Sequence, residues 1–175
     1  MDLLTELAAR VRTVPDFPRP GISFKDITPL LGDPAMLRYA VDVLAWPFLH
    51  DRITKVVGIE SRGFILGAML AHRLGAGFVP VRKPGKLPYT SVSEAYALEY
   101  GTDEVEMHVD AIQEHDRVLI HDDVIATGGT AAATHRLVQR VGGEVVGFAF
   151  LAALDFLNGR EKLDEALRIH TVLHF

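Results

Sequence analysis

Short apolar runs alternate regularly with helical patterns along most of this chain. Strands are expected at 55–59, 78–81, 117–121, 145–154 and, as a short last one, 169–173. Helices are predicted at 63–74 and 130–141, each followed by glycine. Strands that alternate with helices form parallel sheets covered on both faces. We therefore expect an α/β fold with a central, mainly parallel sheet flanked by helices, and ligands beyond the carboxyl ends of its strands.

The residues before the first strand follow another pattern. Residues 1–14 are predicted to form an amphipathic helix, whereas the prolines and glycine of 15–21 exclude a helix. Asp33 is expected to cap a helix that begins at Pro34 and ends near Pro47. Later in the chain, 95–100 and 104–108 are predicted to pair as a hairpin around Gly101, after a loop at 83–93.

Composition excludes several classes of protein. The formal net charge of -5 argues against a nonspecific nucleic-acid binder. The absence of cysteine excludes disulfides, thiolate metal sites and a cysteine nucleophile, and it fits a reducing cytoplasm. The N-terminus lacks the pattern of a signal peptide, and no apolar run approaches the ~20 residues of a membrane helix. We expect a cytoplasmic protein with neither nucleic-acid nor membrane partners.

The third strand runs directly into a turn, His121 to Thr130, that opens the next helix. Backbone N–H groups at a helix N-terminus form an anion cradle, and glycine lets the backbone approach a phosphate closely. The adjacent carboxylates of Asp122 and Asp123 repel phosphate and suit sugar hydroxyls or Mg²⁺. Together these groups predict a ribose 5-phosphate site; the alternative is a capped turn without a ligand.

Residues 118–130 resemble the 5-phosphoribosyl-1-pyrophosphate (PRPP) motif of the type I phosphoribosyltransferases. The resemblance implies that Asp122 and Asp123 face the ribose hydroxyls and their magnesium, an indirect metal contact. It implies that the 5-phosphate is wrapped by Ala126, Thr127, Gly128, Gly129 and Thr130. The chain departs from the family at His121, where an aliphatic residue is usual. We interpret His121 as a partly buried, hydrogen-bonded histidine without a catalytic role.

Other segments resemble the adenine phosphoribosyltransferases within that family, and they lie at 15–27, 58–64, 82–88 and 98–101. With the PRPP motif they cover most of the chain. The resemblance implies one domain over 1–175, in which about 1–33 contribute a hood, and a homodimer with the 82–88 loop near its interface. It also places residues of the hood over the base, namely Ile22, Ser23, Phe24 and Lys25. An aromatic ring such as that of Phe24 suits a purine, although a core phenylalanine is the alternative.

Two further segments supply candidate charged groups. Glu60, Ser61 and Arg62 lie between a strand and a helix, where Arg62 can fork onto pyrophosphate oxygens, or else cap the turn. The resemblance implies that these residues bind PRPP and that a non-proline cis peptide lies near Glu60–Ser61. Lys83 and Lys86 stand on a loop that can close over pyrophosphate, the alternative being a solvated loop.

The resemblance implies the transfer of a 5-phosphoribosyl group from PRPP to adenine, giving AMP and pyrophosphate with Mg²⁺. It puts Glu99 near the base as the proton-handling group, with Arg62 as a second catalytic residue.

One alternative is a 6-oxopurine transferase. Hypoxanthine-guanine enzymes usually carry aspartate where Ala126 stands, whereas xanthine enzymes share the alanine. Another is a non-catalytic PRPP-binding regulator, which the acidic chain and the lack of room for a DNA-binding module disfavour.

Overall fold

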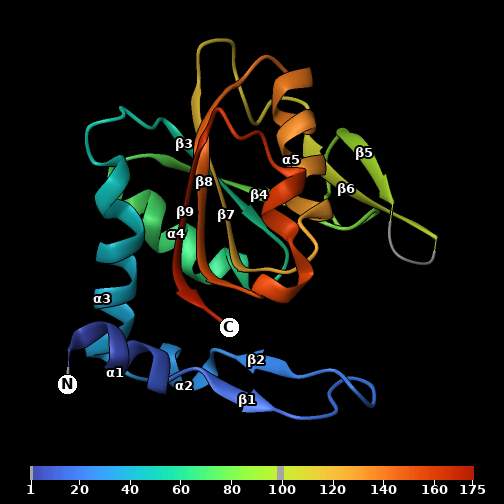
Figure 1. Ribbon diagram of the computed structural model, residues 1–175. Coiled ribbons are helices and arrows are strands. Elements are labelled where there is room, and N and C mark those ends of the chain that lie inside the picture. Colours follow the sequence, from blue (N-terminus) through green and yellow to red (C-terminus); the bar gives the residue numbers. More distant parts are fainter. Residues whose placement is uncertain (1, 98–100) are drawn as a thin grey trace. The chain divides into compact units, whose positions relative to one another are not determined.

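The computed structural model describes residues 2–97 and 101–175 of the chain (Figure 1). The chain forms two compact units, one ending at Val43 and the other comprising Leu44–Phe175. The second unit contains the parallel sheet and the predicted PRPP motif, so its architecture decides where the candidate site lies.

All five strands of the central sheet are parallel, as the alternating pattern predicted, and their order is β4-β3-β7-β8-β9. The strands are β3 (Lys55–Ile59), β4 (Gly77–Val81), β7 (Arg117–Ile125), β8 (Glu144–Ala153) and β9 (Arg168–His174). Most of their buried side chains are apolar, which is the composition that a doubly covered parallel sheet requires. The α/β class expected from the sequence is confirmed.

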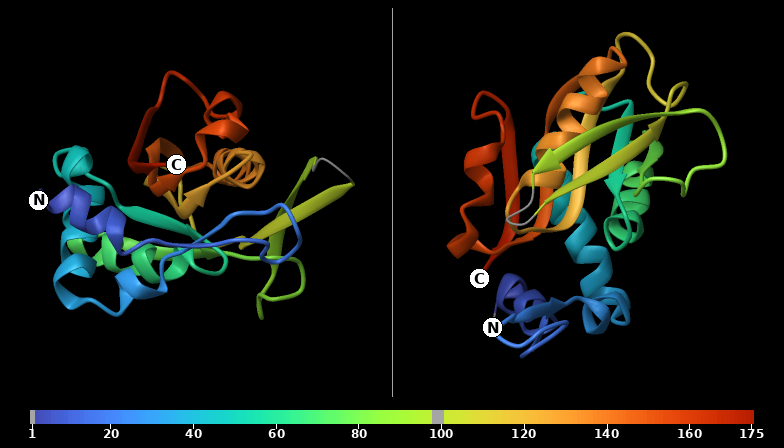
Figure 2. Two further views of the ribbon diagram at one scale, coloured as in Figure 1. Left: turned by 60° about the horizontal axis from the view of Figure 1, so that its bottom comes forward. Right: turned by 90° about the vertical axis from the view of Figure 1, so that its right-hand side faces the viewer.

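Two long helices cover opposite faces of this sheet, as Figures 1 and 2 show: α4 (Gly63–Leu74) and α5 (Gly129–Arg140). The core beneath α5 contains buried aliphatic and aromatic side chains, among them Val57, Ile120, Leu137, Val138 and Phe148. On the other face α4 approaches closely because Gly58 has no side chain. A Cβ atom at Gly58 would lie 3.2 Å from the Gly63 carbonyl oxygen at the start of α4, and 2.5 Å from the Phe78 ring of β4.

A separate two-stranded antiparallel sheet, β5 (Ser91–Ala97) and β6 (Thr102–His108), packs beside α5. This is the predicted hairpin, although β5 begins four positions before the expected start at Ala95. A backbone bridge between Arg82 and Glu106 connects the hairpin to the end of β4. After β8 the chain forms the short 3-10 helices η2 (Asp155–Leu157) and η3 (Gly159–Lys162).

The first unit contains α1 (Leu3–Ala9), β1 (Arg12–Val14), β2 (Phe24–Asp26) and α2 (Thr28–Leu31), and α3 (Pro34–Ala45) continues into η1 (Trp46–Phe48). The prediction of one helix over 1–14 was wrong beyond the ninth residue. Residues 12–14 instead pair with β2, where the Arg12 guanidinium also donates to the Asp26 carboxylate at 2.5 Å. The expected cap of α3 is confirmed, because Asp33 accepts backbone N–H groups of Ala35 and Met36.

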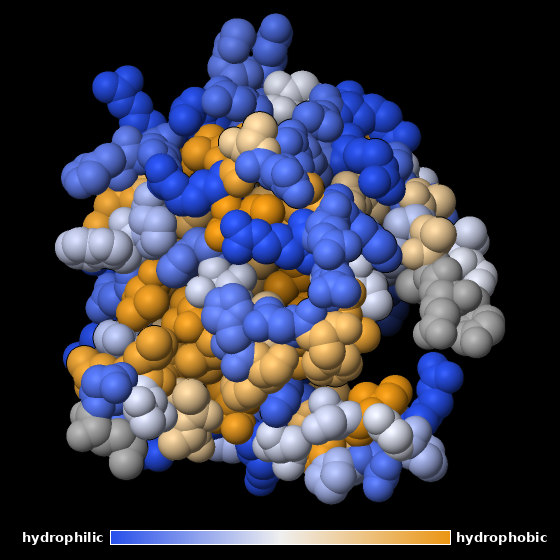
Figure 3. All heavy atoms as spheres, in the orientation of Figure 1, coloured by the Kyte–Doolittle hydropathy of each residue, from blue (hydrophilic) through white to orange (hydrophobic). Residues whose placement is uncertain are grey.

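No helix in the described part of the chain is both long and apolar enough to cross a membrane. Hydrophilic side chains dominate the upper part of the face drawn in Figure 3. Large apolar side chains exposed in the second unit include Trp46 (75%) and Ile65 (45%).

Candidate functional site

The two adjacent aspartates lie within a strand and not in a loop. The sequence suggested that this strand ends at His121, but β7 continues to Ile125. The extension exists because Asp122 and Val124 pair with residues of β8 in the parallel ladder. The ladder therefore fixes the backbone that carries both carboxylates, before any ligand arrives.

A cavity of about 80 Å³ opens where β7 ends and α5 begins. Its lining includes Asp122 and most of the predicted phosphate loop, namely Ala126, Thr127, Gly128 and Thr130. Gly129 does not line it, because this residue is buried against the Tyr96 ring; a Cβ atom there would be 3.1 Å from Tyr96 Cδ2. Gly128 adopts φ 75 and caps α5, so the backbone turns sharply into the helix. The arrangement combines a helix N-terminus with one carboxylate at the rim.

The two aspartates differ in their surroundings. Asp122 is partly accessible from the cavity, and its Oδ1 accepts the backbone N–H of Asp123 at 2.9 Å. Asp123 is 3% exposed, and its Oδ2 lies 2.9 Å from Nε of Arg62. Burial raises the pKa of both carboxyls, and the neighbouring Asp123 charge raises that of Asp122 further, whereas Arg62 offsets part of the effect at Asp123. Asp122 is thus the aspartate that faces the cavity, and Asp123 is the one that positions Arg62.

The Glu60–Ser61 peptide is cis, as the resemblance implied. Glu60 turns toward the following basic loop. Its carboxylate accepts the Lys83 backbone N–H at 2.8 Å and the Arg82 guanidinium at 3.2 and 3.3 Å, and Lys86 Nζ lies 3.8 Å away. Burial alone raises the pKa of the Glu60 carboxyl, but these donors bring it below its ordinary value. Glu60 thus anchors the loop that carries the two lysines predicted to bind pyrophosphate, while Ser61 is exposed.

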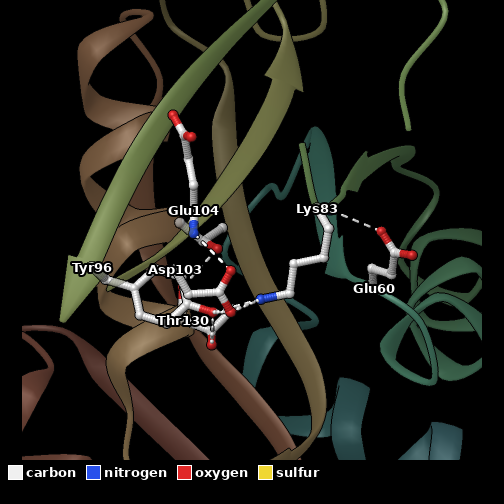
Figure 4. Close-up of polar contacts among 7 residues, drawn as sticks. Glu60, Lys83, Tyr96, Asp103, Glu104 and Thr130 are labelled. Atoms are coloured by element: carbon white, nitrogen blue, oxygen red, sulfur yellow. Dashed lines mark hydrogen bonds and ion pairs between the residues drawn. The ribbon is translucent and has the colours of Figure 1, made fainter. Parts of the chain in front are cut away.

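Lys83 extends from the end of β4 into a polar cluster on the hairpin (Figure 4). Its ammonium group is paired with the Asp103 carboxylate and donates to the Tyr96 hydroxyl at 2.8 Å. Tyr96 and Asp103 are directly opposed in the β5–β6 register. The Thr130 hydroxyl, at the start of α5, lies 3.1 Å from the Tyr96 hydroxyl. The structure thus connects a predicted pyrophosphate ligand to a residue of the predicted phosphate loop.

The predicted base-binding residues lie in the first unit. Phe24 and Lys25 belong to β2, whereas Ile22 and Ser23 precede it and are exposed. The Phe24 ring packs edge-on against that of Phe17, with centroids 5.1 Å apart. Lys25 donates through its Nζ to the Thr13 hydroxyl at 2.9 Å. The remaining candidate, Glu99, lies outside the described residues.

His121 is more deeply buried than expected, with no exposed surface. Its Nδ1 bonds to the Ala149 carbonyl at 2.9 Å, and because a carbonyl only accepts, Nδ1 carries the proton. Burial lowers the pKa of His121 to about 4. The ring is therefore neutral at physiological pH and does not face the cavity, which agrees with the expectation of a structural role.

We expect His121 to make the fold acid-sensitive. The unfolded chain has a histidine pKa near 6.5, so the contribution of neutral His121 is fully present above that pH and is lost as pH falls toward 4. The loss amounts to about 3 kcal/mol. Urea denaturation at about pH 7.5 and about pH 4.5 should show a smaller decline for His121→Leu than for the wild type. Equal declines would contradict this assignment.

Sequence reasoning missed three residues that shape the site. Gly159, at the start of η3, packs against the phosphate loop, so that a Cβ atom on Gly159 would lie 2.1 Å from the Ala126 carbonyl oxygen. The Asn158–Gly159 dipeptide signalled a turn but not this contact. Tyr96 and Asp103 carried no local signal at all, because their importance depends on hairpin register.

A second cavity, of about 590 Å³, lies beside the C-terminal segment and shares Ile125 with the first. Acidic and basic side chains line it, and it contains none of the predicted PRPP ligands. Beside it His174 Nδ1 lies 3.1 Å from the Asp155 carboxylate. The smaller cavity, with its helix N-terminus and carboxylate, has the chemistry that a sugar phosphate needs.

Comparisons with known proteins agree with these observations. The model of the family described as "Phosphoribosyl transferase domain" matches residues 30–169. An adenine phosphoribosyltransferase of Myxococcus xanthus is 60% identical over 173 residues, covering 99% of this chain and 94% of its own. The crystal structure of the enzyme from Rhodothermus marinus is 66% identical, with a TM-score of 0.96, and the match covers 99% of this chain and 98% of that one.

A more distant crystal structure contains ligands. The adenine phosphoribosyltransferase of Saccharomyces cerevisiae, complexed with adenine and an imino-altritol bisphosphate, is 40% identical with a TM-score of 0.91. The match covers 98% of each chain. The similarity therefore extends over the first unit, the sheet and the phosphate loop alike.

Proposed function

Because the chain belongs to the adenine phosphoribosyltransferase family, we propose that it transfers the 5-phosphoribosyl group of PRPP to adenine, giving AMP and pyrophosphate. The observation that carries this proposal is the cavity at the carboxyl end of β7, where the helix N-terminus of α5 meets the Asp122 carboxylate. Backbone N–H groups suit the 5-phosphate, and a carboxylate suits the ribose hydroxyls. One ligand that carries both groups is the phosphoribosyl unit.

Different residues of the site would bind different parts of PRPP. Asp122 would accept hydrogen bonds from the ribose hydroxyls, and residues 126–130 would hold the 5-phosphate. Arg62, oriented by Asp123, would bind the pyrophosphate, because a guanidinium has several donors and can contact two anions at once. Lys86 and Lys83 stand on the loop that Glu60 anchors, where they would add positive charge.

The residues present fit a magnesium ion that is held mainly through the substrate. In the described part of the chain, no group of three or more histidine and acidic side chains converges as a metal cage. Asp122 offers a carboxylate at the rim, and Mg²⁺ commonly binds through one or two carboxylates together with substrate oxygens and water. When bound, the ion would supply positive charge to the departing pyrophosphate.

The reaction then needs positioning and charge compensation, and no covalent intermediate. As the bond to pyrophosphate breaks, the anomeric carbon gains positive charge while Arg62 and Lys86 compensate the negative charge of the leaving group. Residues 22–25 would hold adenine, with Phe24 stacked on the ring. Glu99 would accept the proton that adenine loses as its nitrogen attacks.

The same proposal includes the arrangement of the protein. We propose one functional domain over 1–175 in which about 1–33 form the hood, and a cytoplasmic homodimer. Trp46 and Ile65 expose apolar side chains of the kind that association surfaces contain, and the molar mass of the protein in solution tests whether it forms a dimer.

The purified chain should convert adenine, PRPP and Mg²⁺ to AMP and pyrophosphate. Parallel assays with hypoxanthine, guanine and xanthine should give much slower turnover, because a site built to pair with one base edge leaves polar groups unpaired with another. Absence of AMP formation from adenine, in protein that is folded by circular dichroism, would refute the assignment.

A further inference from the structure

The Tyr96 hydroxyl is surrounded by three hydrogen-bonding partners within the described chain. It lies 3.0 Å from Oδ2 of Asp103, 2.8 Å from Nζ of Lys83 and 3.1 Å from the Thr130 hydroxyl. Figure 4 shows these side chains converging from the loop after β4, from the hairpin and from α5. We call Lys83, Tyr96, Asp103 and Thr130 the clasp.

The charges of the clasp dictate where its protons lie. A carboxylate only accepts and an ammonium only donates, so the Tyr96 proton points to Asp103 while Lys83 donates to Tyr96. The Tyr96 oxygen then has one acceptor position left, and Thr130 must donate into it. The pKa of Asp103 is lowered by its hydrogen bond from Lys83, which keeps the carboxylate charged. The Thr130 hydroxyl is therefore committed to Tyr96 and presents lone pairs to the cavity that it lines.

This proton arrangement opposes anion binding. A phosphate needs donors, but the Thr130 proton is already used and the Lys83 charge is already neutralised by Asp103. We propose that Asp103 is a positioning residue that holds Lys83 and Thr130 in a resting arrangement, and that PRPP must displace it to recruit both groups. The proposal rests on the proposed function, which makes PRPP the ligand of this cavity.

Exchange of Asp103 for PRPP is physically reasonable. The side chains of Lys83 and Asp103 are 40% and 31% exposed, so water screens their pairing and the contact is weak enough to exchange. A pyrophosphate group carries more negative charge than a carboxylate and offers more acceptor oxygens to the ammonium. The Lys83 backbone stays fixed during the exchange, because its N–H is bonded to Glu60.

The test is the Asp103→Asn variant, assayed with PRPP varied at saturating adenine. We expect the KM for PRPP to fall about threefold, with kcat and the KM for adenine unchanged, because the clasp weakens only the binding of PRPP. The affinity of Mg²⁺–PRPP for adenine-free enzyme, measured by calorimetry, should rise by the same factor. In a Lys83→Met background the Asp103→Asn change should have at most a small effect on the KM for PRPP, because Asp103 then has no ammonium group to neutralise.

The matched control is Glu94→Gln, which removes another acidic side chain of the same hairpin that pairs with Arg136 at 2.7 Å. It should leave the KM for PRPP unchanged. Tyr96→Phe frees the Thr130 hydroxyl and should therefore also lower the KM for PRPP. This variant replaces Asp103→Asn as the test if Asp103→Asn does not fold. An unchanged or higher KM in the folded variants would overturn the proposal. Failure of the wild type to use adenine would refute the proposed function instead, and calorimetry with PRPP would still test the clasp.

Discussion

The Gly128→Ala variant is expected to lose nearly all activity and about 3 kcal/mol of stability. Gly128 has φ 75, a conformation that an alanine adopts only at a cost. Its added Cβ atom would also lie 2.0 Å from the Gly159 carbonyl oxygen, which is main chain and cannot rotate away. Either the phosphate loop or the segment after β8 must move. Denaturant unfolding and the assay for AMP formation measure the two effects.

Gly75 provides a matched control for this prediction. It also has a positive φ, 69, but it ends α4 in open space, with no atom within 4 Å of an added Cβ. Gly75→Ala should cost about 1 kcal/mol and leave activity intact. Gly159→Ala should behave like Gly128→Ala, because its added Cβ atom would collide with the backbone of the phosphate loop. Equal behaviour of the Gly128 and Gly75 variants would show that the close contact is unimportant.

The Asp122→Asn variant is expected to be more stable than the wild type and far less active. Burial and the adjacent Asp123 charge raise the pKa of Asp122 above its value of 3.8 in the unfolded chain. The stabilisation from this shift is present below pH 3.8 and is lost as pH rises through the folded-state pKa, so ionisation of this buried carboxyl lowers the stability of the fold. Asparagine removes the charge and keeps an oxygen for the Asp123 N–H.

At neutral pH we expect a gain of about 1 kcal/mol in the free energy of unfolding. The value of kcat/KM for PRPP should fall about 100-fold, because charged hydrogen bonds to the ribose are lost. Glu144→Gln is the control: this acid begins β8, is 59% exposed and pairs with Arg117. Its effects should stay within about 0.5 kcal/mol, with normal activity. An Asp122→Asn variant that is less stable would contradict the electrostatic argument.

The sheet and its covering helices were predictable because their signals are local. Buried strands and α4 can be recognised from a few consecutive residues, and so can the glycine that ends the helix. Features that depend on pairing partners could not be predicted in this way. Residues 12–14 look helical until β2 pairs with them, and β7 extends past His121 because β8 lies alongside it.

In the candidate site, too, local features could be predicted and features that depend on pairing partners could not. The phosphate loop could be identified from its own residues, since glycines and hydroxyls at a helix start are a local pattern. Adjacent residues of a strand point to opposite sides, but the two aspartates were expected to lie in a turn. The motif therefore did not reveal that Asp122 faces the cavity while Asp123 contacts Arg62. The partners of Lys83 are supplied by the hairpin register, which a reading of the 82–88 loop does not contain.

The contact between Gly128 and Gly159 also limits how the connection after β8 can vary in length. Inserting or deleting a residue among 154–158 would shift η3 along the main chain and bring a different residue against the Ala126 carbonyl. Surface connections ordinarily tolerate such changes, but this one forms the outer wall of the phosphate loop. Circular permutation or loop grafting in this enzyme should therefore avoid this connection, even though none of its residues is proposed to touch the substrate.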